Sequence, residues 1–152
     1  MDYLIEQGIK VDAIITDPPY AVTSYSWDQI IPFDQMWDKL SKLIKDDGAI
    51  VLFGNEPFSS SLRMSNPKFY RYDWKWIKTQ VTGFQNAKYQ PLRCYEDIMI
   101  FSKCGAVASA KPPMRYFPQG IIPVNLKVTT KPINYLGDKK SDEKVSYTQE
   151  EA

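Results

Sequence analysis

The chain has 152 residues, of which 43% are hydrophobic, and 19 basic and 18 acidic side chains leave a net charge of +1. This length and composition predict one folded domain with a real core. The absence of histidine excludes Ser-His-Asp and Cys-His catalysis, and two cysteines alone exclude the usual four-ligand zinc sites.

The chain also lacks the signals of a membrane or exported protein. No apolar run approaches the ~18 residues that a membrane span requires. Asp2 and Glu6 argue against a signal peptide. We therefore expect a cytoplasmic protein with no membrane partner and no metal. Cys94 and Cys104 could form a disulfide, but in a cytoplasmic protein we expect two free thiols.

The first third of the chain predicts a strand, a helix and a second strand. Residues 2–7 predict a short helix that Gly8 ends, and 12–17 a buried strand followed by a loop at 21–31. Apolar residues at helical spacing then predict a helix that stops near Gly48: Phe33, Met36, Trp37, Leu40, Leu43 and Ile44. Residues 48–54, GAIVLFG, predict the second buried strand, so the segment is a βαβ unit with parallel strands.

The rest of the chain alternates less regularly. Pro57 is placed to open a short helix through Met64. Residues 72–78 and 96–103 predict two further strands, joined by a long loop at 79–95. We expect an extended or variable segment at 106–136 and a mobile charged tail at 137–152.

The first predicted strand ends in an unusual tetrapeptide, Asp17-Pro18-Pro19-Tyr20. One interpretation is a simple strand terminator, because proline and aspartate both favour turns. The other is a binding site: ligands of open α/β sheets bind at the carboxyl ends of strands, and proline holds the preceding residue extended. There, the Asp17 carboxylate and the Pro18 carbonyl can accept hydrogen bonds from one amino group, and the Tyr20 ring can stack on a base.

Basic residues gather in the middle of the chain, where residues 63–103 carry 8 basic and 3 acidic side chains. Cations and rings alternate in and around the loop at 79–95, as suits a splayed nucleotide strand. The candidate nucleic-acid-binding residues are Lys78, Phe84, Lys88, Tyr89 and Arg93. The alternative is that the rings belong to the core and the cations are merely solvated.

Together, DPPY, GAIVLFGNEPF and WKWIKTQVTGFQNAKYQPLRCYEDIMIFSK resemble the DNA amino-methyltransferases of the β class, and phage and prophage adenine methylases look most similar. The resemblance spans residues 9–105, so it marks 1–105 as a catalytic segment. It implies an α/β fold: a partial Rossmann-like methyltransferase sheet, with strands equivalent to 4-5-7-6 and flanking helices.

The resemblance also implies an activity. The family transfers a methyl group from S-adenosylmethionine to the exocyclic amino group of a flipped-out DNA base. Asp17, Pro18, Pro19 and Tyr20 would be catalytic, and Asp17, Phe53 and Gly54 would contact the cofactor. The aspartate form of the motif favours adenine N6 over cytosine N4.

Some family motifs are missing. Neither the Gly-rich cofactor loop near DPFxGSGTT nor the HPTQKP stretch before it occurs, and Tyr95 stands where relatives usually have histidine. We therefore expect a catalytic half cut off before most of its cofactor pocket. The alternatives are an inactive relic that retains weak DNA binding, or methylation of RNA or protein amides, although protein-amide enzymes typically carry Asn in place of Asp17.

The resemblance further predicts an incomplete sheet, because the family's strands 1, 2 and 3 have no counterpart here. The strand at 13–17 would then lie at an exposed edge, which invites pairing with another chain. We expect a homo-oligomer, most simply a two-fold dimer, or a complementing chain, burying the face near Ile14, Ile15 and the helix at 33–46. Alternatively, residues 105–136 fold back over this edge.

Overall fold

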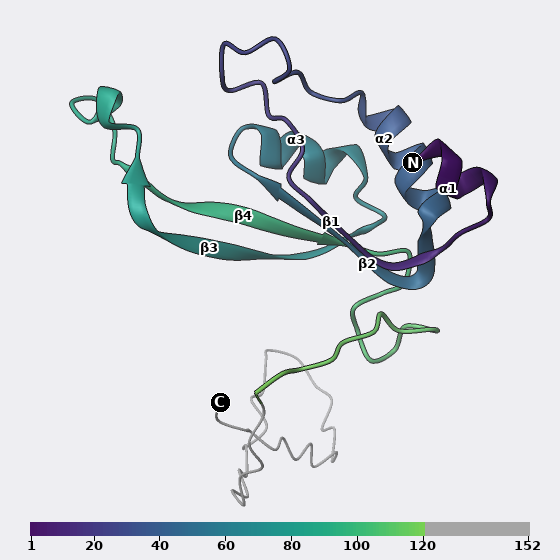
Figure 1. Cartoon of the computed structure of the whole chain (residues 1–152). Coiled ribbons are helices and arrows are strands. Elements are labelled where there is room, and N and C mark those ends of the chain that lie inside the picture. The colour runs from purple at the N-terminus through teal and green to yellow at the C-terminus, as the bar shows by residue number, and fades with distance from the viewer. Residues whose placement is uncertain (121–152) are drawn as a thin grey trace, which may run out of the picture. The chain divides into compact units, whose positions relative to one another are not determined.

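The computed structural model describes residues 1–120, of which 1–115 form one compact unit (Figure 1). Every predicted helix and strand within these residues is present. The elements are α1 (Asp2–Glu6), β1 (Val11–Thr16), α2 (Phe33–Leu43), β2 (Ile44–Gly54), α3 (Phe58–Ser65), β3 (Tyr70–Thr82), the 3-10 helix η1 (Phe84–Asn86) and β4 (Arg93–Phe101).

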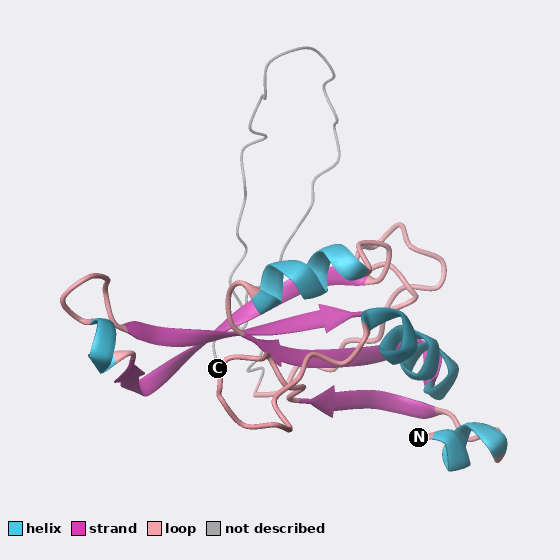
Figure 2. Cartoon of the chain, turned by 90° about the horizontal axis from the view of Figure 1, so that it is seen from above, coloured by secondary structure: helices cyan, strands magenta, loops and turns pink. Residues whose placement is uncertain are grey.

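The four strands form one mixed sheet in the order β1-β2-β4-β3. β1 and β2 are parallel, as the βαβ pattern predicts, and β4 is antiparallel to both of its neighbours. This order confirms the expected 4-5-7-6 arrangement. Within the described residues, β1 is an edge strand (Figure 2). None of its residues is buried, so the prediction of a buried strand at 12–17 was wrong, because an edge strand has a neighbour on one side only.

Helices α2 and α3 lie on the same face of the sheet (Figure 1). The apolar positions of the two helices pack there on alternate residues of β2 and β4. This core consists of Met36, Trp37, Leu40, Ile44, Ile50, Leu52, Phe58, Leu62, Met99 and Phe101. Because strand side chains alternate between faces, the residues of β2 and β4 that alternate with these core residues point to the other face of the sheet.

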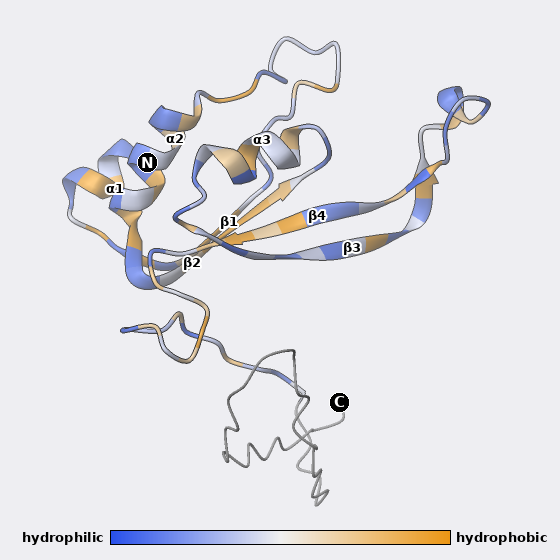
Figure 3. Ribbon diagram, turned by 180° about the vertical axis from the view of Figure 1, so that it is seen from behind, coloured by the Kyte–Doolittle hydropathy of each residue, from blue (hydrophilic) through white to orange (hydrophobic). Residues whose placement is uncertain are grey.

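That other face carries no helix within residues 1–115 and remains partly apolar. Ile15 of β1 is 68% exposed, and Trp74 and Trp76 of β3 are 54% and 49% exposed. Phe53 of β2 reaches the ring of Trp76, with centroids 6.1 Å apart. In Figure 3, hydrophobic colour lies mainly on β1, β2 and the part of β4 beside them, whereas much of β3 and of the hairpin tip is hydrophilic.

The end of helix α2 differs from the prediction. The helix stops at Leu43, and β2 begins at the next residue, so Gly48 lies inside the strand and does not end the helix. Ile44 is fully buried and pairs with Val11 of β1. A Cβ at Gly48 would lie 2.7 Å from the Asp12 carbonyl oxygen, so the glycine serves the close approach of β1 to β2.

The predicted loop at 79–95 is also shorter than expected. β3 and β4 continue into it, because Ile77 pairs with Tyr95 and Thr82 with Arg93. Only residues 83–92 connect the two strands, and they include η1. The sheet thus ends in a long two-stranded hairpin.

Some predictions fall outside this region. Most of the segment at 106–136, and all of the tail at 137–152, lie beyond the described residues. Within residues 1–120, Cys94 and Cys104 are free thiols, as expected. No helix in this part of the chain is long and apolar enough to cross a membrane.

Candidate functional site

The DPPY residues follow β1 at the edge where two parallel strands end together. Thr16 pairs with Leu52, so Asp17 comes level with Phe53 and lies one step from Gly54. The Asp17 side chain is exposed, whereas Pro18 is buried and Pro19 is half-buried. A rigid, buried proline therefore anchors an accessible carboxylate at the carboxyl edge of the sheet.

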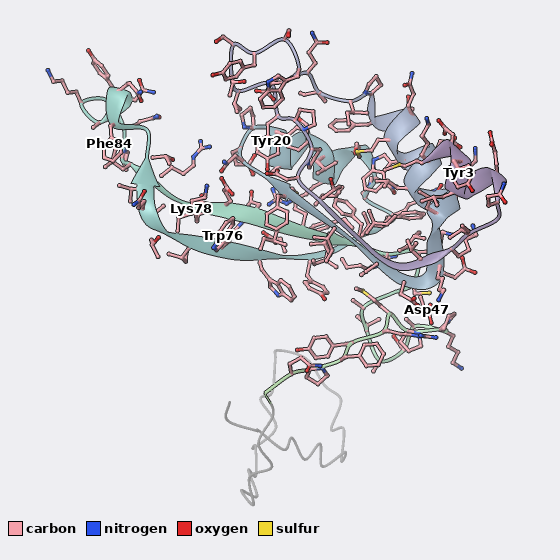
Figure 4. The ribbon with its side chains drawn as sticks, in the orientation of Figure 1. Tyr3, Tyr20, Asp47, Trp76, Lys78 and Phe84 are labelled. Atoms are coloured by element: carbon pink, nitrogen blue, oxygen red, sulfur yellow. The ribbon has the colours of Figure 1, made fainter. Side chains whose placement is uncertain are left out.

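Tyr20, labelled in Figure 4, contacts this carboxylate. Its hydroxyl donates a hydrogen bond to Asp17 Oδ1, and its ring packs against Phe58 of α3 with centroids 5.0 Å apart. Burial, together with the Asp17 carboxylate, raises the pKa of Tyr20 well above its usual range, so the phenol stays a donor. No partner is recorded for Asp17 Oδ2 among the described residues, which leaves an oxygen able to accept from a ligand.

Sequence reasoning missed Asp28, whose carboxylate organises the loop after Tyr20. Its Oδ1 accepts hydrogen bonds from the backbone N–H groups of Tyr20 at 3.0 Å and Ala21 at 2.9 Å. Its Oδ2 accepts from the N–H groups of Val22 at 2.9 Å and Thr23 at 2.6 Å, and from the Thr23 hydroxyl at 2.8 Å. The Thr23 hydroxyl and these N–H groups lower the pKa of Asp28 to about 2, so the side chain is ionised at neutral pH.

The same loop carries an aromatic pair that the sequence did not single out. Tyr25 and Trp27 stack with ring centroids 5.7 Å apart and an angle of 11° between their planes. Both are largely exposed, at 65% and 68%. They add flat apolar surface to the loop that contains Tyr20.

An ion cluster around one buried carboxylate, that of Asp97, lies beside Gly54. Asp97 of β4 pairs in register with Gly54 and is 1% exposed. Its carboxylate bonds Lys75 of β3, and it lies 3.1 Å from the Arg63 guanidinium of α3. These contacts tie α3 and β3 to the strand beside Gly54.

Gly54 itself is closely packed. A Cβ there would lie 2.7 Å from Met99 Cε, 2.9 Å from Ser59 Oγ and 3.2 Å from Phe58 Cδ1. The space beside this glycine is thus filled by the protein's own atoms. The described residues at this edge offer a carboxylate and aromatic rings.

The predicted nucleic-acid residues divide into two groups along the hairpin (Figure 4). Phe84, Lys88, Tyr89 and Arg93 gather at the tip, where all four are exposed. Within residues 1–120 neither Lys88 nor Arg93 forms an ion pair. Lys78 lies lower on β3, bonded to Glu96 and 5.5 Å from the centroid of the Trp76 ring, so its charge is already partnered.

Comparisons with known proteins support the fold. No family model and no curated protein matches this chain. Among solved structures, M1.HpyAVI in complex with SAM aligns at a TM-score of 0.50 and 21% identity, covering 67% of this chain and 50% of its own. The chain has the α/β fold of that structure.

Two further solved structures also align with this chain over about half of their own length. A second crystal structure of M1.HpyAVI matches with the same score and identity over 49% of its length. PvuII DNA methyltransferase (cytosine-N4-specific) matches with a TM-score of 0.44 and 16% identity over 66% of this chain and 45% of its own. This chain spans about half the length of these proteins.

The buried ion cluster predicts a pH-dependent loss of stability. Burial by itself would raise the pKa of Asp97, but Lys75 and Arg63 outweigh it and hold the pKa below its usual value. The charged form therefore stabilises the fold above the unfolded pKa of about 4, and this contribution disappears as pH falls through the lower folded pKa. We expect Asp97→Asn to lower the free energy of unfolding by about 1–3 kcal/mol at pH 7.

Urea unfolding from pH 7 down to pH 2 tests this expectation. The difference between wild type and Asp97→Asn should shrink below about pH 4. Asp38, in an exposed pair with Lys42, provides the control: Asp38→Asn should change stability by less than about 0.5 kcal/mol. Equal stability of the Asp97 variant and wild type at pH 7 would contradict a stabilising role for the cluster.

Proposed function

We propose that this chain is the catalytic portion of an S-adenosylmethionine-dependent DNA amino-methyltransferase, with adenine N6 favoured over cytosine N4. The observation that carries the proposal is the accessible Asp17 carboxylate, anchored by Pro18 at the carboxyl end of β1 and contacted by Tyr20. The shared fold with M1.HpyAVI, one structure of which is a complex with SAM, agrees with it.

Asp17 and Pro18 would act by holding the target amino group. Asp17 Oδ2 and the Pro18 carbonyl would accept its two hydrogens, which orients the nitrogen lone pair outward. The face of the Tyr20 ring away from Phe58 would stack on the base, and Pro19 fixes the turn between them. The base must leave the duplex, because its amino group is inaccessible when it is paired and stacked.

S-adenosylmethionine would supply the methyl group, with Asp17, Phe53 and Gly54 nearest to it. Because the Gly-rich cofactor loop of the family does not occur in this sequence, another chain would have to complete the pocket. The same observation favours a second candidate: an inactive fragment that retains the fold and weak DNA binding. Isothermal titration with S-adenosylmethionine separates the two, because only the first predicts saturable binding by the chain or its complete assembly.

The first functional prediction concerns Asp17. In an assembly that transfers methyl groups, Asp17→Ala should reduce turnover at least about a hundredfold, because the acceptor that orients the amine is lost. Binding of S-adenosylmethionine should change much less. The measurement is transfer of a labelled methyl group to duplex DNA, with nucleoside analysis to identify N6-methyladenine or N4-methylcytosine.

Asp12→Ala is the matched control for this variant. Asp12 lies near the other end of β1, where it pairs with Lys45, and its loss should leave turnover unchanged. Retained turnover in the Asp17 variant would remove Asp17 from the chemistry.

The second functional prediction concerns the hairpin tip. Lys88→Ala combined with Arg93→Ala should weaken DNA binding and reduce the slope of log K against log salt by about 2, since two phosphate contacts are lost. Fluorescence anisotropy with labelled DNA at several salt concentrations measures both quantities. Lys10→Ala with Lys68→Ala removes the same charge away from the tip and should preserve the slope; an unchanged slope in the tip variant would place DNA elsewhere.

The third functional prediction concerns assembly. β1 has a strand partner on one side only among the described residues, and Ile15 is exposed beside it. We propose that this edge pairs with another chain, most simply a second copy in a two-fold dimer. Light scattering at micromolar concentration should give twice the chain mass of 17.6 kDa. A monomer mass would exclude the dimer.

A further inference from the structure

The carboxylate of Asp28 accepts the hydrogen bonds of the turn that begins at Tyr20. Four consecutive backbone N–H groups, from Tyr20 to Thr23, and the Thr23 hydroxyl converge on Asp28. Both carboxylate oxygens are used, and the residue is only 6% exposed. This arrangement far exceeds the single hydrogen bond that an aspartate commonly makes in a turn.

The turn would not keep this shape without a strong acceptor. Ala21 has a φ of 57°, the left-handed region, which a side chain-bearing residue adopts only at a cost in energy. Its N–H donates to Asp28 Oδ1, as does that of the preceding Tyr20. The carboxylate thus stabilises a strained backbone directly beside Tyr20.

Tyr20 connects Asp28 with Asp17, the candidate catalytic carboxylate. Its backbone is held by Asp28, while its hydroxyl donates to Asp17. We propose that Asp28 is a positioning residue of the site: it fixes Tyr20, and through the Tyr20 hydroxyl it fixes the rotamer in which Asp17 meets the target amino group. This inference rests on the proposed methyltransferase function and names a residue that sets its geometry.

The four N–H groups of residues 20–23 and the Thr23 hydroxyl form a nest of donors around Asp28, and this nest requires a carboxylate. All five groups around Asp28 donate, so the side chain must accept at both oxygens. Asparagine has the same shape, but its NH₂ group would face N–H donors and leave them without an acceptor. Asp28→Asn therefore removes the nest with little change in volume.

A simpler role must be distinguished from this one. The Tyr20 ring also packs on Phe58, so α3 alone could hold the ring while Asp28 merely braces its own loop. In that case, loss of the nest would loosen residues 21–23 and leave the Tyr20 side chain in place. The two roles differ in what happens at Tyr20.

The experiment measures the environment of the Tyr20 side chain by ¹⁹F NMR, in the absence of cofactor and DNA. The chain is labelled with 3-fluorotyrosine, and the Tyr20 signal among the ten tyrosines is assigned by Tyr20→Phe. In ¹⁹F NMR, Asp28→Asn should move the Tyr20 resonance to the position of exposed tyrosines and leave the tyrosines outside this loop in place; Tyr25, whose carbonyl accepts from the Asp28 N–H, is not used as a reference. Amide hydrogen exchange should show loss of protection at residues 20–23 only.

Two further variants complete the test. Asp34→Asn, an exposed aspartate on α2, is the control and should leave the Tyr20 signal and exchange unchanged. Asp28→Glu keeps the charge and both acceptors, so it should restore part of the protection. If Asp28→Asn does not fold, Thr23→Val, which removes only the hydroxyl donor, should shift the Tyr20 signal in the same direction by less.

Kinetics link the geometry to the reaction. In a methyl-transferring assembly, Asp28→Asn should lower kcat about a hundredfold, the usual scale for a misplacement of about 1 Å, with KM for S-adenosylmethionine within about twofold of wild type. An unmoved Tyr20 signal with unchanged kcat would overturn the inference and leave the proposed function standing. Absence of methyl transfer in every preparation would instead refute the proposed function, and the Tyr20 signal would still decide whether Asp28 positions that residue.

Discussion

The parallel pairing of β1 with β2 is the contact on which the rest of the site depends. It brings the carboxyl ends of two strands to one edge, so Asp17 comes level with Phe53 although 35 residues separate them in the sequence. α2 supplies the crossover and most of the cover on one face. Gly48 allows the strands to approach, because any side chain there would collide with the Asp12 carbonyl and Ile44. The pairing of the two backbones thus sets the position of Asp17, and the loop after β1 supplies the side chains around it.

Three carboxylates near this edge have different surroundings. Asp28 is surrounded by N–H and O–H donors from its own loop, which keep it ionised. Asp97 is buried and depends on Lys75 and Arg63 for its charge. Asp17 is exposed, and its recorded contact within residues 1–120 is the Tyr20 hydroxyl. The first two hold backbone and helix in place, and the third is the one whose free oxygen can meet a ligand.

The sheet is covered asymmetrically within residues 1–115. Sheets with parallel strands usually have helices on both faces, yet here α2 and α3 share one face and Ile15, Trp74 and Trp76 remain exposed on the other. The chain also spans about half the length of the solved structures that share its fold. Within the described residues, the sheet thus has an apolar face without a helix and an edge strand, β1, with a strand partner on one side only.

The sequence by itself determined the βαβ unit and the rigid DPPY turn, whereas the order of the strands was implied by the resemblance to the amino-methyltransferases. The unit and the turn are encoded locally, by runs of apolar residues, by helical spacing and by prolines whose restrictions apply wherever they stand. Only the tertiary structure distinguished Asp28 from the equally unremarkable Asp34, showed that β2 begins at Ile44, and extended the hairpin to residues 82 and 93. Each of these depends on a partner distant in the chain or across a turn: N–H donors that converge on one carboxylate, Val11 beside Ile44, and Arg93 opposite Thr82. A linear pattern does not contain such contacts, because they exist only once the backbone has folded.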